Sequence, residues 1–550
     1  MTFSSGNSPS CLSFACAMLF AATAIAQDAV PIPGPNVNMV SGTQWPGGDP
    51  YLQRQNEPSL GVSSRNPLHL LAGANDYRTV DLSLVVDRIV GDAWLGVFKS
   101  FDGGLTWRST LLPGYPQDSS PDGLASPIKG FAAGADPTVR PGTNGLFYYS
   151  GIAFNRGDNA QGSVFVARFI DNNNKEGGDP IQYLDATVVD SGTAGQFLDK
   201  PWLAVDIPRS GAHMCGGCGG QSFLVGNIYL TYSRFVGGDN SSKIMLTRST
   251  DGGATWSTPI KVSEGLQRVQ GTTITIDPIT GSVYVAWRQF KSSNAPDAIV
   301  VAKSVDGGQR FTKVVQVALI DPFDQGSSSV SFRTNSFPTM TVDGTGRVYL
   351  AWSQRLVPDG DARIVLSTSI DGAIWTPPVE VDPVPSSQDN PSGRGHQIMP
   401  ALASAGGKLM LVYYDLRFDS TVGILTPLGG GQFAETREPV GDLPTSPDNV
   451  FNKFLADAAP PNFTSPIGRR HTMDLRAALA QAGPAPTFTS AQVSQYSYGS
   501  PSTVPSVKPI KQLQFNPPNL PLFAQGTTPF MGDYVDDAAQ MSATVALPAR

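Results

Sequence analysis

The sequence has few cysteines, few charged residues and almost no long apolar runs, and each shortage excludes a class of protein. Only 4 of the 550 residues are cysteine, which excludes a small scaffold held together by disulfides. Charged residues make up 15% of the chain, and the net charge is −7 without a run of Lys or Arg. Nucleic acid is therefore not an expected partner. Beyond the first 26 residues, no apolar stretch is long enough to cross a membrane as a helix.

The one long apolar run stands at the start of the chain. It extends from Cys11 to Ala24 and leads into Ala24-Ile25-Ala26, a small-x-small pattern that precedes Gln27. This pattern predicts a cleaved signal peptide at 1–26, followed by an N-terminal extension at 27–50. The stretch before the apolar run has no Lys or Arg, so an uncleaved membrane anchor is the alternative. We expect a secreted, periplasmic or extracellular protein.

Removal of the signal would leave two cysteines, Cys215 and Cys218, in the sequence HMCGGCGG. A disulfide between them is the expected state in an exported protein. With His213 they would offer three soft metal ligands, but no fourth ligand is nearby in the sequence. A redox pair would need the N-terminus of a helix, whereas the glycines indicate a loop. We therefore expect a Cys215–Cys218 disulfide, no metal and no cofactor.

The chain repeats itself six times. A strand-like phrase that is rich in β-branched and aromatic residues recurs at 68–78, 146–156, 227–235, 282–290, 347–355 and 408–418. A second phrase, often with a proline near its start, precedes each copy, at 56–62, 135–139, 199–206, 270–277, 336–343 and 396–403. A third phrase follows each copy, as in WLGVFKS, KIMLTRS and AIVVAKS. Glycine (58 residues) and proline (46 residues) are abundant, as hairpin turns require.

Three strands and a looser fourth, repeated six times, predict a propeller. The expected fold is all-β, a six-bladed β-propeller over 51–545. Two insertions, about 79–96 and 419–470, separate a second strand from a third, and a Pro-rich tether covers 497–529. The phrase FMGDYVDDAAQ follows this tether, too near the chain end to begin a seventh blade. It either adds a strand to close the ring or lays Asp533 and Tyr534 onto the axial face.

A turn motif follows the third phrase in several repeats. SFDGGLTW (100–107) and STDGGATW (249–256) have the form S-x-D-x-G-x-T-W, and SVDGGQRF and SIDGAIW are degenerate copies. In such a turn, the Asp carboxylate accepts hydrogen bonds from backbone N–H groups, and a glycine supplies a positive φ. These motifs are Asp boxes, and with NEPSL, GANDYR and DKPW they make 56–540 resemble the sialidase superfamily and its Asp-box relatives. Asp boxes are structural, so they indicate the fold and not the reaction.

An arginine stands at the end of every second strand, once in each repeat. The six are Arg78, Arg156, Arg234, Arg288, Arg355 and Arg417. Arginine binds carboxylates in a bidentate manner, so several around one axis would bind the carboxylate of a substrate. In the alternative, each arginine braces its own blade by pairing with a neighbouring acidic residue.

Acidic residues and tyrosines are expected on the same face. Glu57, Asp136 and Asp199 open first strands, and Tyr77 and Tyr534 lie nearby. The resemblance to sialidases implies an arginine cluster that holds the substrate carboxylate, a nucleophilic tyrosine and an acid/base carboxylate. From register and chemistry, the candidate catalytic residues are Asp76, Tyr414 and Asp415. The Arg-Ile-Pro phrase of the family is missing, so its catalytic residues are not carried over one by one.

The resemblance implies an exported glycoside hydrolase that releases terminal sialic acid, or a similar acidic sugar, from glycans. A non-catalytic propeller that binds glycans or proteins at the cell surface is the main alternative. A hydrolase or lyase for another anionic sugar is a third possibility. The chain has no HExxH, GxSxG or phosphate-loop motif that would indicate another chemistry.

Overall fold

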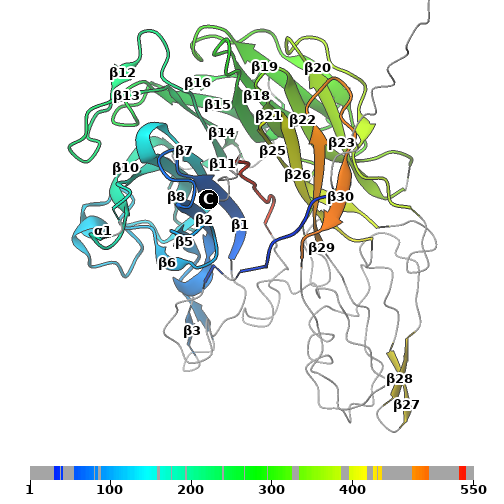
Figure 1. Ribbon diagram of the computed structural model, residues 1–550, viewed down its shortest axis with the longest axis horizontal. Coiled ribbons are helices and arrows are strands. Elements are labelled where there is room, and N and C mark those ends of the chain that lie inside the picture. The colour runs from blue at the N-terminus through cyan, green and yellow to red at the C-terminus, as the bar shows by residue number, and fades with distance from the viewer. Residues whose placement is uncertain are drawn as a thin grey trace, which may run out of the picture.

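The computed structural model describes most of the chain between residues 30 and 540. The described residues are 30–37, 39–40, 55–79, 81–83, 88–157, 161–174, 176–192, 195–237, 241–265, 267–293, 295–324, 333–358, 360–385, 395–417, 425–429, 432–435, 474–494 and 532–540. Six four-stranded sheets follow one another around a central axis, in chain order from blue to orange (Figure 1). The predicted all-β, six-bladed propeller is confirmed. The signal peptide and the tether at 497–529 lie outside the described residues.

Each of the first three blades is built from one continuous stretch of chain. Blade 1 comprises β1 (Gln55–Val62), β2 (Leu70–Asp76), β5 (Trp94–Ser100) and β6 (Arg108–Leu111). Blade 2 comprises β7 (Ala133–Pro141), β8 (Leu146–Phe154), β9 (Gly162–Asp171) and β10 (Ile181–Gly192). Blade 3 comprises β11 (Gln196–Val205), β14 (Ile228–Val236), β15 (Ser241–Ser249) and β16 (Ile260–Lys261).

The last three blades repeat the same antiparallel order. Blade 4 comprises β17 (Val269–Ile276), β18 (Val283–Gln289), β19 (Ala298–Ser304) and β20 (Val315–Leu319). Blade 5 comprises β21 (Thr339–Val342), β22 (Val348–Arg355), β23 (Ala362–Ser369) and β24 (Val379–Glu380). Blade 6 comprises β25 (Gln397–Ala405), β26 (Lys408–Asp415), β29 (Asp474–Gln481) and β30 (Thr489–Gln492).

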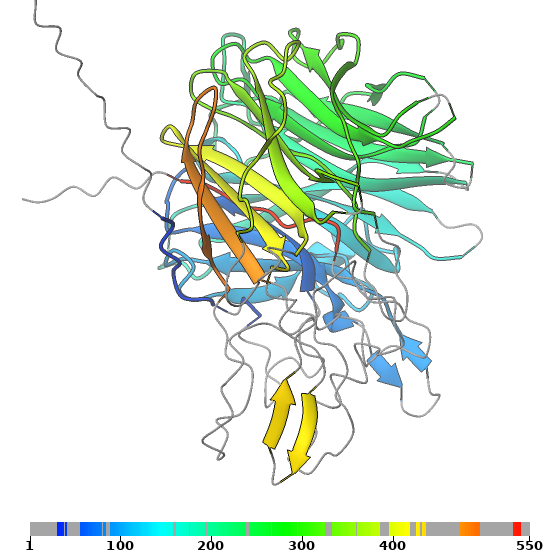
Figure 2. The same cartoon turned by 90° about the vertical axis from the view of Figure 1, so that its right-hand side faces the viewer.

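Smaller elements lie outside the six four-stranded sheets. These are η1 (Tyr77–Thr79), β3 (Asp81–Ser83), β4 (Arg88–Val90), α1 (Pro121–Ala125), η2 (Thr143–Gly145), β12 (His213–Met214), β13 (Leu224–Val225), β27 (Leu425–Gly429) and β28 (Gln432–Glu435). The β3–β4 and β27–β28 hairpins fall within the two predicted insertions and project from the same side of the molecule (Figure 2). In the described part of the chain, no helix is long and apolar enough to cross a membrane.

The hydrophobic core lies between neighbouring blades rather than at one centre. Leu71 of blade 1 packs in one cluster with Phe147 of blade 2, and comparable clusters join each blade to the next as far as blade 6. Burial of side chains from two sheets at once explains why each sheet needs both neighbours. N-terminal residues lie between the last and first blades: Asn36 Nδ2 donates to Val493 O, and Met39 packs on blade 1.

The four motif turns have the hydrogen bonds that the sequence predicts. In blade 3, Asp251 accepts bonds from the backbone N–H (2.9 Å) and the hydroxyl (2.6 Å) of Thr255, and the Trp256 indole donates to the carbonyl of Gly253. Gly253 has a φ of 88°. Trp256 packs on a cluster that blades 2 and 3 share. The equivalent turns of blades 1, 4 and 5 are centred on Asp102, Asp306 and Asp371.

Candidate functional site

Three charged side chains converge on the axis because of a backbone irregularity that the first strands share. Glu57, Asp136 and Lys200 each precede a proline, and each has a positive φ of 54°, 59° or 51°. A β-bulge interrupts the pairing with the second strand at each position. A left-handed backbone conformation before proline is unfavourable for any residue except glycine. A β-bulge redirects side chains, and the three bulges direct these side chains towards the axis.

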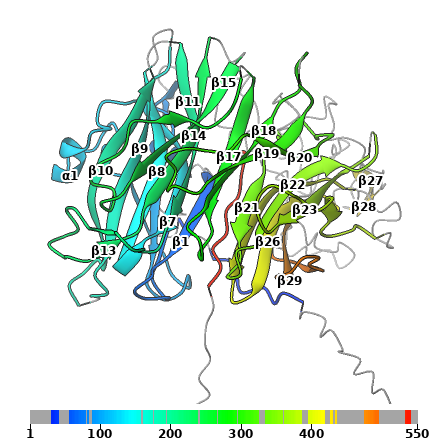
Figure 3. The ribbon, with the colours of Figure 1, turned by 90° about the horizontal axis from the view of Figure 1, so that it is seen from above.

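Residues 532–540 lie among the blades along the axis (Figures 1 and 3). The backbone N–H of Asp533 donates to Glu57 Oε1 (2.8 Å), and the Asp533 carboxylate lies 2.5 Å from Lys200 Nζ. The Tyr534 hydroxyl donates to the carbonyl of Pro137 (2.9 Å). Of the two arrangements that the sequence allows for this segment, the structure therefore has the one with Asp533 and Tyr534 at the axis.

Four ionisable side chains share one buried site, which we call the axial cluster: Glu57, Asp136, Lys200 and Asp533. Each of them is at most 6% exposed. Burial, together with Asp136 and Asp533, raises the pKa of Glu57 to about 8 despite the opposing charge of Lys200. Burial also opposes ionisation of Asp533, but Lys200 and Arg333 outweigh it and lower the pKa of Asp533 to about 2. At neutral pH Glu57 is therefore protonated and Asp533 is ionised, although both belong to one cluster.

Three partly exposed polar residues lie close to the cluster. The Arg333 side chain, 43% exposed, binds Asp533 through Nε (2.8 Å) and NH2. Asp199 precedes Lys200 and accepts a hydrogen bond from Gln270 (2.5 Å). Burial raises the pKa of Tyr77 to about 12, although a hydrogen bond with Asn56 acts in the opposite direction. These residues connect the buried cluster with solvent.

Further along the axis, the second halves of the first strands and residues 536–540 line a cavity of about 710 Å³. Here Asp536 accepts bonds from Ser59 Oγ (2.6 Å) and Arg140 NH1 (2.5 Å). The Arg140 guanidinium also lies over the Trp202 ring, 5.1 Å from its centroid. The cluster and the cavity therefore share the C-terminal segment as a common wall.

The six strand-end arginines are held by partners of their own. Five pair with carboxylates: Arg78 with Asp76, Arg156 with Asp92, Arg234 with Asp190, Arg288 with Asp297 and Asp324, and Arg417 with Asp415 and Asp382. Arg355 donates to the carbonyl of Gly360 and lies over the ring of Phe323. Among the described residues, no two of the six share a carboxylate. These are the pairings that the bracing alternative predicts, and binding of a substrate carboxylate by these arginines stays a prediction.

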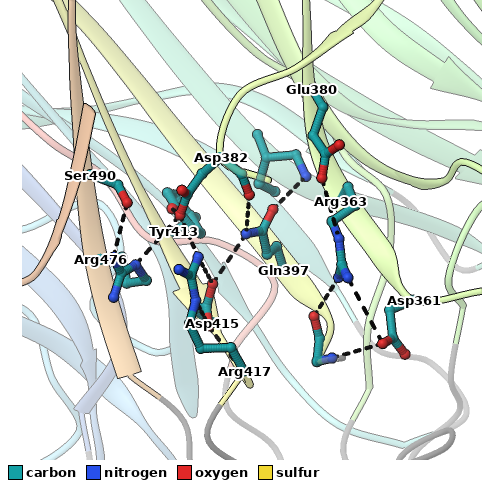
Figure 4. A network of polar contacts seen from close by, with 12 residues as sticks. Asp361, Arg363, Glu380, Asp382, Gln397, Tyr413, Asp415, Arg417, Arg476 and Ser490 are labelled. Carbon is teal, nitrogen blue, oxygen red and sulfur yellow. Dashed lines mark hydrogen bonds and ion pairs between the residues drawn. The ribbon is translucent and has the colours of Figure 1, made fainter. Parts of the chain in front are cut away.

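Figure 4 shows the most extensive of these pairings, which we call the Asp382 network. Asp382 follows the outer strand of blade 5 and accepts bonds from Tyr413 and Arg417 of blade 6. Arg476 of blade 6 lies 3.5 Å away. Asp190 makes the same contacts between blades 2 and 3, with Tyr232 and Arg234. A carboxylate from one blade thus holds a Tyr and an Arg of the next.

Two of the three candidate catalytic residues, Asp76 and Asp415, are engaged in similar contacts. Asp76 and Asp415 are both fully buried, and each accepts bonds from the backbone N–H and guanidinium of the arginine two residues later. Desolvation raises the pKa of Tyr414 to about 12, whereas activation of a nucleophile requires a lower pKa. Their catalytic assignment stays a prediction.

Sequence reasoning placed Glu57, Asp136 and Asp199 on the axial face but missed Lys200 and Arg333. Lys200 has a sequence signal, because it precedes Pro201 in the same position that Glu57 and Asp136 occupy before their prolines. Arg333 has none, since it lies in the connection between β20 and β21 rather than in a repeated phrase.

The cysteine prediction is confirmed, because Cys215 and Cys218 form a disulfide bond. The β12–β13 hairpin lies within this part of blade 3, and Gly216 O accepts a bond from Arg168. In the described part of the chain, no group of three or more His, Cys, Asp or Glu side chains is arranged to hold a metal ion.

No protein-family model matches the sequence, and no curated protein matches it. Among solved structures, the chain is similar to a Dyadobacter fermentans protein of unknown function, at 16% identity over 66% of this chain and 90% of that one (TM-score 0.36). It is also similar to an α-L-arabinofuranosidase from Fusarium graminearum, at 14% identity over 66% and 88% (TM-score 0.39). A Hadza microbial sialidase is 15% identical over 68% and 65% (TM-score 0.38). No residue role is carried over from these proteins.

Proposed function

We propose that this protein is an exported glycoside hydrolase that releases a terminal acidic sugar, of the sialic acid type, from glycans. The observation that supports the proposal is Glu57, a carboxyl group of the axial cluster that is protonated at neutral pH. Glu57 keeps its proton at neutral pH and Asp533 does not, because their surroundings move the two pKa values in opposite directions. A carboxyl group that keeps its proton at neutral pH can act as the general acid of glycoside hydrolysis.

In this proposal, Glu57 is the general acid that protonates the leaving oxygen of the glycosidic bond. Asn75 Nδ2 donates to Glu57 Oε2 (2.8 Å) and fixes the orientation of the carboxyl group. Lys200 and Arg333 supply positive charge for the carboxylate of an acidic sugar. Asp199 and Tyr77 are further polar groups beside this position.

Turnover of a fluorogenic sialoside by the purified mature chain tests the proposal. Glu57→Gln keeps the shape of the protonated carboxyl group but cannot give up a proton in the same way, so kcat should fall by about 10²–10⁴-fold. Glu176→Gln, which alters an exposed carboxylate, should keep the activity of the unmodified chain. Activity should also decline as the pH rises through about 8 and Glu57 ionises. Absence of turnover between about pH 4 and 8 would overturn the proposal.

A second candidate function is non-catalytic binding of glycans or proteins. The observation that favours it is that residues 532–534 cover Glu57, while the strand-end arginines are engaged in ion pairs. A glycan-binding assay and a turnover assay on the same purified chain distinguish the two candidates. Binding of sialylated glycans without any turnover would favour the second.

A further inference from the structure

The Asp533 carboxylate is bound in the way that proteins bind a small anionic ligand. An ammonium and a guanidinium hold it from two sides, with Lys200 Nζ at 2.5 Å and Arg333 Nε at 2.8 Å. Asn335 Nδ2 adds a longer contact of 3.3 Å. The ligands come from β11 of blade 3 and from the connection between β20 and β21. A bidentate guanidinium together with an ammonium is a strong arrangement for a carboxylate.

The residues on either side of Asp533 are also closely packed. Gly532 has a φ of 95°, and a Cβ there would lie 2.5 Å from Glu57 Cγ. The Tyr534 ring packs edge-on against Trp202 with their centroids 5.3 Å apart. A cavity of about 30 Å³ lies beside Lys200, Met399 and Tyr534, which is space for one or two water molecules. Asp533 itself occupies the position between Lys200 and Arg333.

We propose that Lys200 and Arg333 form the carboxylate subsite of the axial site, and that Asp533 of the C-terminal segment occupies it as an internal ligand. This inference rests on the proposed function and deepens it by naming the residues that recognise the acidic sugar. Glu57 lies within reach of the same subsite, since its Oε1 is 3.4 Å from Lys200 Nζ. An acidic ligand and the C-terminal segment therefore compete for one position, and the segment must withdraw before Glu57 can contact a substrate.

The charges in the cluster explain why the subsite needs an anion. Lys200 is 6% exposed, and a buried ammonium without a counterion is strongly unfavourable. Glu57 is neutral at pH 7, so Asp533 is the main source of compensating charge. Withdrawal of the segment would leave a buried cation beside the partly exposed Arg333. A ligand carboxylate at that position restores the lost compensation.

Chemical rescue of Asp533→Ala tests this inference. The variant removes the carboxylate and leaves space for a small anion, so its Tm should be lower than that of the unmodified chain. Sodium acetate should raise the Tm of the variant saturably, relative to sodium chloride at equal ionic strength, because only a bound ligand stabilises in this way. The unmodified chain should show no such rise, since Asp533 already fills the position.

Two further variants make the test specific. Val535→Ala loosens the same segment but keeps Asp533, so its Tm should fall without a response to acetate. Asp533→Ala combined with Lys200→Met should lose the acetate response of the single variant. Equal acetate responses in Asp533→Ala and Val535→Ala, or no response in either, would overturn the inference. The readout is stability, so a chain without glycosidase activity can still show the rescue, and failure of one proposal is distinguishable from failure of the other.

If Asp533→Ala does not fold, Asp533→Asn serves instead, because it keeps the size of the side chain. Loss of the negative charge should let acetate compete with the segment. Amide hydrogen exchange in residues 532–540 should then become faster as acetate is added, and it should stay unchanged in the unmodified chain. Exchange in the variant that does not depend on acetate would contradict the inference.

Discussion

The axial cluster and the Asp382 network are both buried sets of carboxylates and cations, but their charges are balanced differently. In the Asp382 network, Arg417 faces two carboxylates, and Tyr413 and Arg476 add further contacts to Asp382. Burial alone would lower the pKa of Arg417, but Asp415 and Asp382 raise it. In the axial cluster three carboxyl groups share Lys200, with Arg333 at Asp533, and Glu57 is left with a pKa of about 8.

The difference separates a structural role from a chemical one. The charges in the Asp382 network have fixed partners from their own or the adjacent blade, so the network joins blades 5 and 6. The axial cluster holds a proton on Glu57 that is lost near pH 8. Groups whose pKa lies close to the working pH are those that perform acid and base chemistry.

Breaking the Asp382 network should give the largest effect on stability. Arg417→Met removes the cation that holds Asp415, a carboxylate that is fully buried. Loss of one partner of a buried ion pair costs about 3–5 kcal/mol of unfolding free energy. Denaturant unfolding should show this loss, while the affinity for acidic sugars should remain unchanged in the folded protein. A loss of affinity without a loss of stability would instead make Arg417 a ligand-binding residue.

Arg156→Met is the matched control. Arg156 is another strand-end arginine that is paired with an aspartate, but its side chain is 69% exposed. Exposed pairs contribute about 0.2–1 kcal/mol, so this variant should unfold close to the unmodified chain. Equal losses in the two variants would show that burial does not decide the role of these arginines.

The protonation of Glu57 in the axial cluster should appear in the pH dependence of stability. The pKa of Glu57 rises from 4.5 in the unfolded chain to about 8 in the fold, so the folded state binds the extra proton between these values. The contribution of Glu57 is therefore complete below pH 4.5 and is lost as the pH rises towards 8, by about 1.4 kcal/mol per pH unit.

Glu57→Gln should remove this slope, as measured by unfolding at successive pH values across that window. Glu176→Gln should keep it, because Glu176 lies in an exposed loop. An identical pH dependence in the unmodified chain and in Glu57→Gln would mean that Glu57 is ionised in the fold at neutral pH.

The sequence predicts the blades well because their determinants are local. A first strand with its proline, a hairpin turn and a motif turn such as that at Asp251 each depend on residues a few positions apart. The direction of a strand-end arginine depends only in part on local residues, such as the aspartate two residues before Arg78 and before Arg417. Arg234 pairs with Asp190 of the preceding blade, and Arg417 reaches Asp382, so the partner is set by the packing of two sheets.

The residues of the candidate site lie still farther apart in the sequence. Glu57 and Asp533 are separated by 476 positions but are joined by a hydrogen bond, and Arg333 reaches Asp533 from a third region. The repeat places Glu57, Asp136 and Lys200 in equivalent positions, which is a signal in the sequence. The entry of the C-terminal segment between them depends on the whole ring and has no counterpart within one repeat.

We expect acidic ligands to bind at the axial cluster and not at the strand-end arginines. A crystal structure of the Asp533→Ala variant, grown with acetate and then with a sialic acid, decides between the two sites. It should show a carboxylate between Lys200 Nζ and the Arg333 guanidinium, with Arg78, Arg234 and Arg417 still paired to their aspartates. A carboxylate bound instead by two or more strand-end arginines, with Lys200 and Arg333 uninvolved, would contradict this expectation.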